Sequence, residues 1–288
     1  DLTSGSDSKI SSSGDVVIAP SGTNFGRDSS ISFEVEAGSF AIGSENALGT
    51  ATKTITISGS VKVQDDFLAA GNTLGILGTI SNQNPQGSVQ FLSSATTNLG
   101  GTSVEIDADG EVLLRAGTVF FGSGTTITGS ANVTIESQST AFTSMPALTN
   151  LGLGPSISGF TFGKESEIGS LTIPRPYSIN GPFHVNAGTV TVDSSVSVTS
   201  ASADLVLRAL NNLNVNASGD LSTNQGRAVL WSNADGDASN NGAMNIASGA
   251  VIETNGGSVT LAGGATVDGA GLPTGYIKAS NQNSLIFR

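Results

Sequence analysis

Short runs in which apolar and polar residues alternate recur along the whole chain, and each is entered or left through Gly, Asn, Asp or Ser. Such alternation indicates a half-buried β-strand, because successive side chains of a strand point to opposite faces. In residues 189–192 it places Val190 and Val192 on one face and Thr189 and Thr191 on the other. Since no window carries a sustained helical apolar period between caps, we expect an all-β protein.

The strands predicted in this way are short and closely spaced. They include Thr54–Ile57, Ser88–Phe91, Val104–Ile106, Val112–Leu114, Thr118–Phe121, Val133–Ile135, Leu171–Ile173, Val190–Val192 and Val259–Leu261. Between residues 104 and 135 there is no room for helices between the strands, so a parallel β-solenoid with coils of roughly 20 to 25 residues is expected. A β-sandwich is the structural alternative, although sandwich strands usually run longer and use more aromatic residues than the 5% found here.

The segment 141–158 breaks the alternation and contains Pro146 and Pro155, which are poor occupants of a central strand. We therefore expect a single elongated solenoid over residues 1–288, with possible sub-blocks 1–140 and 159–288 on either side of this irregular segment.

Charge and cysteine content exclude several functions. The net charge is −12, and only 11 Lys and Arg residues are scattered along the chain, whereas phosphate recognition needs a basic stripe; no nucleic acid partner is expected. The absence of Cys removes disulfides, thiolate nucleophiles and Cys-ligated metals. No run approaches the roughly 18 apolar residues of a membrane span, so no membrane insertion is expected either.

Residues 159–264 have a recurrent sequence pattern, with motifs such as Val229-Leu230-Trp231-Ser232 and Asn255-Gly256-Gly257-Ser258-Val259-Thr260-Leu261. This pattern resembles the repeat regions of filamentous-haemagglutinin-like bacterial exoproteins and adhesins. The resemblance implies a right-handed parallel β-helix and a location outside the cell or on the bacterial cell surface. It implies no specific ligand.

One loop has the composition of a cation site. In Asn233-Ala234-Asp235-Gly236-Asp237, side-chain oxygens occur at every second residue, the spacing by which calcium loops wrap oxygen ligands around the ion. An EF-hand frame beginning at Asn233 would need Gly and Glu where the chain has Ala238 and Met244. The pattern favours a solvated turn, and calcium bound by Asn233, Asp235 and Asp237 is the alternative.

Two further features are catalytic candidates. His184 is the only histidine, and its alternation with Phe183 and Val185 predicts that it simply points outward from a strand. The acidic segment 107–111 joins two apolar strands and is typical of a turn. No nucleophile elbow of the form G-x-S-x-G is present, so the chain is not expected to be an enzyme.

The function that the sequence favours is that of an extracellular structural or adhesive protein: a surface stalk, an adhesin segment or a self-associating filament subunit. The expected partners are copies of itself or adjoining β-solenoid segments end to end, and surface glycans. The alternative is a carbohydrate-active β-helix enzyme, a polysaccharide lyase or hydrolase, because solenoids host both kinds of function.

Overall fold

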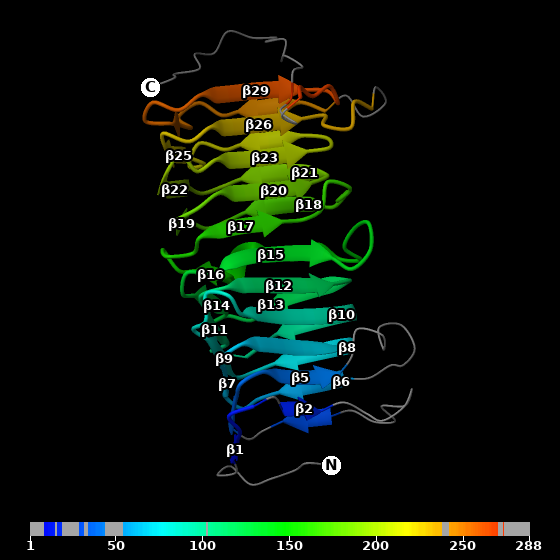
Figure 1. Cartoon of the computed structure of the whole chain (residues 1–288). Helices are drawn as coiled ribbons and strands as arrows, with labels where there is room; N and C mark the ends of the chain where they lie inside the picture. The colour runs from blue at the N-terminus through cyan, green and yellow to red at the C-terminus, as the bar shows by residue number, and fades with distance from the viewer. Residues whose placement is uncertain are drawn as a thin grey trace. The chain divides into compact units, whose positions relative to one another are not determined.

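The computed structural model describes residues 9–14, 16–18, 29–31, 34–43, 54–101, 103–237, 242–269 and 273. The chain divides into two compact units, Asp1–Ile157 and Ser158–Arg288. In both units the described residues form short strands stacked in successive coils (Figure 1). No described residue lies in an α-helix, and the one helical turn is the 3-10 helix Leu148–Asn150.

The first unit contains strands β1 to β16. Their bounds are β1 Lys9–Ser11, β2 Val16–Ile18, β3 Ser29–Ile31, β4 Glu34–Ala37, β5 Phe40–Gly43, β6 Thr54–Ile57, β7 Val61–Val63, β8 Asp66–Ile76, β9 Thr79–Asn82, β10 Ser88–Leu99, β11 Glu105–Ala108, β12 Glu111–Ala116, β13 Thr118–Phe121, β14 Thr126–Thr128, β15 Asn132–Ser137 and β16 Gly152–Leu153. One face follows the order β1-β4-β7-β9-β11-β14-β16 and the next follows β2-β5-β8-β10-β12-β15. The long strands β8 and β10 continue past a corner, where β6 and β13 pair with their second halves.

The second unit contains strands β17 to β29. Their bounds are β17 Gly159–Phe162, β18 Ser170–Ile173, β19 Tyr177–Ile179, β20 Phe183–Ala187, β21 Thr189–Val192, β22 Val196–Ala201, β23 Leu205–Ala209, β24 Leu213–Val215, β25 Leu221–Asn224, β26 Ala228–Ser232, β27 Met244–Ile246, β28 Ile252–Glu253 and β29 Val259–Gly263. Three strand columns result: β17-β20-β23-β26-β29, β18-β21-β24-β27 and β19-β22-β25-β28. The four coils that begin at β17, β20, β23 and β26 each contribute one strand to each column, and β29 begins the next coil.

The pairing between these strands is parallel, for example Phe183 with Leu205 and Leu205 with Ala228. Parallel pairing between successive coils confirms the predicted β-solenoid and excludes the β-sandwich, whose sheets are antiparallel. Many contacts between coils join residues 21 to 23 positions apart, within the predicted coil length. The last coil is longer, with partners 31 residues apart, because the connection between β26 and β27 contains more residues than the corresponding connections of the earlier coils.

The interior is a narrow stack of apolar side chains, as the alternation predicts. Val190 and Val192 are fully buried, whereas Thr189 and Thr191 face outward. Aromatic rings add to the stack in each unit. Phe67 lies between Phe40 and Phe91, with ring centroids 5.8 and 5.3 Å apart, and Phe183 lies 5.0 Å from Phe160.

Glycine is required where the backbone at the corner of one coil lies in close contact with the backbone of the preceding coil. A Cβ atom at Gly226 would lie 1.7 Å from the carbonyl oxygen of Ala203, so no other residue fits there without movement of the backbone. The Thr223 hydroxyl closes the same corner by donating a 2.7 Å hydrogen bond to the Gly226 carbonyl, and Thr254 repeats this bond to Gly257 in the next coil.

The irregular segment 141–158 holds the 3-10 turn and the two-residue strand β16. The boundary between the two compact units falls at its end, between residues 157 and 158. The single solenoid and the sub-blocks expected from the sequence stay predictions.

Candidate functional site

Polar side chains at the corners mainly link one coil to the next. In each of several corners, an Asp or Asn just before or at the start of a strand accepts a hydrogen bond from a backbone N–H one coil later. The pairs are Asp66 with Ser88, Asp109 with Ser130, Asp204 with Arg227, Asn212 with Ala243 and Asp220 with Val251, at 2.8 to 3.0 Å. This device satisfies backbone groups that the turn would otherwise leave unpaired.

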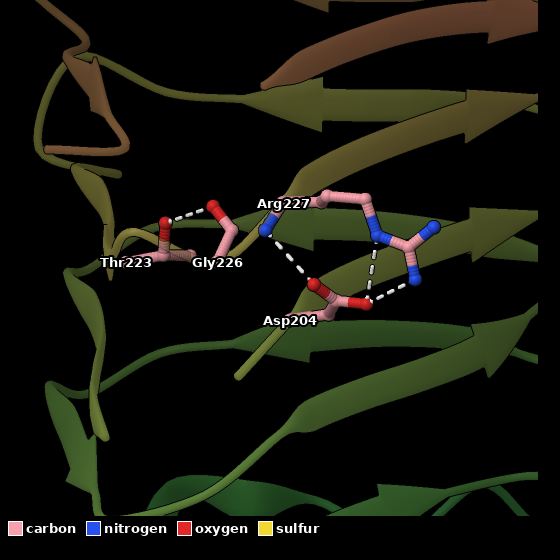
Figure 2. A network of polar contacts seen from close by, with 4 residues as sticks. All are labelled: Asp204, Thr223, Gly226 and Arg227. Atoms are coloured by element: carbon pink, nitrogen blue, oxygen red, sulfur yellow. Dashed lines mark hydrogen bonds and ion pairs between the residues drawn. The ribbon is translucent and has the colours of Figure 1, made fainter. Parts of the chain in front are cut away.

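The corner formed by Asp204 and Arg227 is the most highly charged of these (Figure 2). Oδ1 of Asp204 accepts a 2.8 Å bond from the backbone N–H of Arg227, and Oδ2 accepts bonds from Nε at 3.0 Å and from Nη2. Burial raises the pKa of Asp204, but the hydrogen bonds and charge of Arg227 outweigh it, and the net pKa lies below its ordinary value. Asp204 is therefore a fixed anion that is already bound to a cation.

His184 lies near this ion pair and is flanked by Thr161 and Val206 on neighbouring strands. It is half-buried and points outward between the buried Phe183 and Val185. Burial lowers its pKa; the charge of Asp204 raises it and the charge of Arg227 lowers it, with a net pKa below the ordinary value. A neutral imidazole at pH 7 results. The alternation of apolar and polar residues did not predict the electrostatic partners of His184. An alignment of the sequence segments that contain β23 and β26 would have placed Asp204 opposite Arg227.

A second outward cluster surrounds the only tryptophan of the chain. Trp231 packs with Leu210, Ala234 and Ala262, and its indole Nε1 donates a 2.8 Å hydrogen bond to the Gly264 carbonyl. The guanidinium of Arg208 lies 5.0 Å from the ring centroid, a cation–π distance. Trp231 is only 8% exposed, so it is a covered packing residue and offers no open platform for a sugar ring.

The predicted oxygen-rich loop begins directly after this cluster. Asn233 adopts a left-handed backbone, and its carbonyl accepts a 3.0 Å hydrogen bond from the Gly236 N–H. The Asp235 carboxylate accepts a 3.1 Å bond from the Asp237 N–H. These bonds form a compact turn. The Oδ1 atoms of Asn233 and of Asn211, one coil earlier, are buried and accept no hydrogen bond.

The acidic segment 107–111 lies at the turn between β11 and β12. Asp109 accepts hydrogen bonds from the backbone N–H and hydroxyl of Ser130, and Asp107 accepts one from Thr128. Within the described part of the chain, no three His, Asp or Glu side chains gather as a metal-binding group.

Comparisons with known proteins identify no relative: no protein-family model, no curated protein and no solved structure matches this chain. Among the residues that the structure describes, none belongs to a helix long and apolar enough to cross a membrane.

Proposed function

We propose that this chain is a structural or adhesive segment of an extracellular protein, used as a surface stalk, an adhesin segment or a self-associating filament subunit. The observation that supports this proposal is the use of its polar side chains. They bond one coil to the next along the stack, as Arg115 does with Glu136 at 2.5 Å and Arg227 with Asp204. Charged groups bound in this way stabilise a scaffold of stacked coils and are not free to act on a substrate.

On two outer faces of the second unit the outward side chains of successive strands are uncharged, until Glu253 on β28 follows Ser222. On one, Asn245 donates to Asn214 at 2.8 Å, and Thr191 occupies the equivalent place on the coil before. On the other, Ser222 donates to Ser197 at 3.0 Å. Amide and hydroxyl groups of this kind suit weak contacts with water and surface glycans. The resemblance of residues 159–264 to adhesin repeats supports the same proposal.

The last coil of the second unit supports association end to end. Val259 and Leu261 continue the inward positions of Ala228 and Leu230 but are partly exposed, whereas the latter two are fully buried. Strand β29 pairs with β26 on one side, and no further described strand pairs with its other edge. A second copy, or an adjoining solenoid segment, would cover these apolar side chains and pair with the strand.

Electron microscopy and light scattering over a range of concentrations test this proposal. Association into elongated assemblies is expected. Leu261→Lys should weaken it, because the lysine would replace an inward apolar group at the end of the stack. Thr260→Lys is the matched control on the outward side of the same strand and should associate normally. A dispersed monomer at high concentration, or equal loss in both variants, would contradict the proposal.

The second candidate is a polysaccharide lyase or hydrolase, which the proximity of His184 to Asp204 and Arg227 favours. Incubation with acidic and neutral polysaccharides, followed by assay of reducing ends and unsaturated products, tests this candidate. Activity that disappears in His184→Ala and persists in Thr161→Ala would favour the enzyme over the scaffold.

A further inference from the structure

Strand β26 is buried on both of its faces. Val229 and Trp231 point outward from it, yet every residue of the strand is buried, and Val229 is only 1% exposed. The outward neighbours of Val229 in the adjacent strands, Val206 and Thr260, are partly exposed. An outward valine that is covered more completely than both of these neighbours indicates that another part of the chain lies over it.

The chain that follows β29 is positioned to provide this cover. Gly264 comes directly after the strand, with a positive φ of 86° that lets the backbone turn aside, and its carbonyl accepts a 2.8 Å hydrogen bond from the Trp231 indole. Farther along the chain, Asp268 interacts electrostatically with Arg227, the residue that precedes β26. The segment 264–268 therefore runs back from near the end of β26 to its beginning.

The reach of this segment matches the part of β26 that it spans. The strand between Trp231 and Arg227 is about 13 Å long, at about 3.3 Å per residue. Gly264 and Asp268 have the same separation in sequence, so they span about the same distance when the chain between them is extended. Val229 lies midway between Trp231 and Arg227, so a chain fastened at both points crosses over it.

The segment 264–268 lies at the surface and is flanked by glycines. Residues 265–269 are all exposed, and a Cβ atom at Gly264 or Gly269 would meet no atom within 4 Å, so both ends can rotate. The Arg227 side chain, with which Asp268 interacts, is 44% exposed, and exposed ion pairs are weak. Surface segments of this kind open before the coils beneath them unfold, because they bury few apolar side chains.

We propose that residues 264–268 form a strap that closes over the outward face of β26 and opens without unfolding of the coils. The closed strap shields Val229 and one side of Trp231, and its opening controls access to the only tryptophan of the chain. Val267 forms an antiparallel bridge with Pro273, so the strap opens together with the chain that follows it. Because the strap lies on the outer face of a strand, this inference does not depend on association at the end of the stack.

A single introduced thiol can report on the strap, because the chain contains no cysteine. Val229→Cys places the thiol beneath the strap, and Leu230→Cys places it on the inward side of the same strand, where only unfolding of the coils exposes it. Asn245→Cys on β27 is the exposed reference. Mass spectrometry measures the rate of reaction with a thiol reagent. We expect Val229→Cys to react about tenfold or more faster than Leu230→Cys and about tenfold or more slower than Asn245→Cys.

Reversal of the charge that holds one end of the strap should open it. Asp268→Lys places a cation beside Arg227 and should raise the labelling rate of Val229→Cys about threefold, the size expected for loss of an exposed charge pair. The labelling rate of Leu230→Cys should stay the same. Glu253→Lys makes the same change of charge on β28 and is the matched control, with no expected effect on either rate.

Opening of the strap can also be followed without a cysteine substitution. Asp268→Lys should increase the quenching of Trp231 fluorescence by acrylamide, because the strap then shields the indole less often, whereas Glu253→Lys should not. Circular dichroism checks that each variant is folded.

Three results would overturn the proposal. Equal labelling rates for Val229→Cys and Leu230→Cys would mean that the outward face opens only when the coils unfold. Labelling of Val229→Cys as fast as that of Asn245→Cys would mean that no strap closes over the strand. Unchanged labelling and quenching in Asp268→Lys would mean that Asp268 does not hold the strap at Arg227.

Discussion

The two units of this protein turn the corners of similar coils by different means. In the first unit β8 and β10 bend within one long strand, and the pairing register shifts between Ser93 and Thr96. The buried Ser93 hydroxyl holds this bend: its one proton lies within hydrogen-bond reach of the carbonyls of Asn72 and Thr96, and its oxygen accepts a 3.3 Å hydrogen bond from the Ala95 N–H. A side chain inside the strand therefore makes the corner.

In the second unit the strands are shorter, and backbone conformation makes the corner. Ser202, Gln225 and Gly256 adopt positive φ values of 62°, 65° and 106° at corresponding places in three successive coils. Thr223 and Thr254 then close the corners with their hydroxyl groups. The difference shows that the stacked apolar interior sets the coil geometry. Either a side-chain hydrogen bond or a left-handed backbone conformation can then form the corner.

The largest expected effect tests whether the two units are energetically separate. Phe91→Ala removes a fully buried ring that packs against Phe67 at a tilt and should lower the free energy of unfolding of the first unit by about 3 to 5 kcal/mol. Phe183→Ala should do the same in the second unit. Denaturant unfolding is followed by the fluorescence of Trp231, which lies in the second unit.

In a solenoid whose coils contact only their neighbours, Phe183→Ala should shift the Trp231 transition far more than Phe91→Ala does. Equal shifts would show that the two units unfold in a single cooperative transition. The different corners would then not correspond to units of separate stability.

The next effect concerns the close contact at the corners. Gly226→Ala in the second unit and Gly110→Ala in the first would each place a Cβ within 2 Å of a carbonyl oxygen of the preceding coil. Each should lower the free energy of unfolding by about 1 to 3 kcal/mol through overpacking. Gly269→Ala, with no atom within 4 Å of the added Cβ, is the control. A tolerated Gly110→Ala beside a disruptive Gly226→Ala would show that only the second unit has rigid corners.

Removal of the corner hydroxyls should give a smaller effect. Ser93→Ala in the first unit and Thr223→Val in the second each remove a buried donor, at a cost of about 1 kcal/mol per hydrogen bond. Because the Ser93 hydroxyl donates one hydrogen bond and accepts another from the Ala95 N–H, whereas the Thr223 hydroxyl donates one to the Gly226 carbonyl, Ser93→Ala should be the more destabilising. Chemical denaturation measures the order, and the reverse order would mean that backbone conformation alone holds the bend in the first unit.

The smallest effect is a pH dependence specific to the second unit, which holds the only histidine. The pKa of His184 lies below its ordinary value, mainly because of burial, so the unfolded chain binds this proton first. The stabilising contribution is thus complete above about pH 6.5 and is lost as the pH falls below it, with a slope of at most about 1.4 kcal/mol per pH unit. His184→Asn should flatten this slope in Trp231-detected unfolding. An unchanged slope would assign it to carboxylates instead.

Much of the fold could be predicted because period-two alternation acts within single strands. The predicted segments Thr54–Ile57 and Thr118–Phe121 coincide with β6 and β13, and most of the others lie inside observed strands. The bend within β10 was not predicted, since Ser93 and Thr97 interrupt the apolar side of the strand with buried hydroxyls. The hydrogen bonds of Ser93, one of them to the preceding coil, account for its place there, and no local pattern contains them.

The loop of Asn233, Asp235 and Asp237 was only partly predicted from the sequence. The spacing of these residues indicated the loop, but it did not indicate that the Asn233 N–H donates a hydrogen bond to the carbonyl of Asn211 in the preceding coil. Asp204 and Arg227 are 23 residues apart and meet because they directly precede β23 and β26, which are neighbouring strands of successive coils.

By itself, the sequence determined the strand type of the chain, the side of each strand that is buried and the scarcity of basic side chains. These properties depend on residue type and on spacing within a few positions, which a linear pattern records. The tertiary structure alone decided which residues become neighbours across coils. That outcome depends on the length of each turn, because an insertion such as the one between β26 and β27 changes the separation of cross-coil partners from 23 to 31 residues. A local pattern cannot supply this register, since it is fixed by the stacking of whole coils around a shared apolar interior.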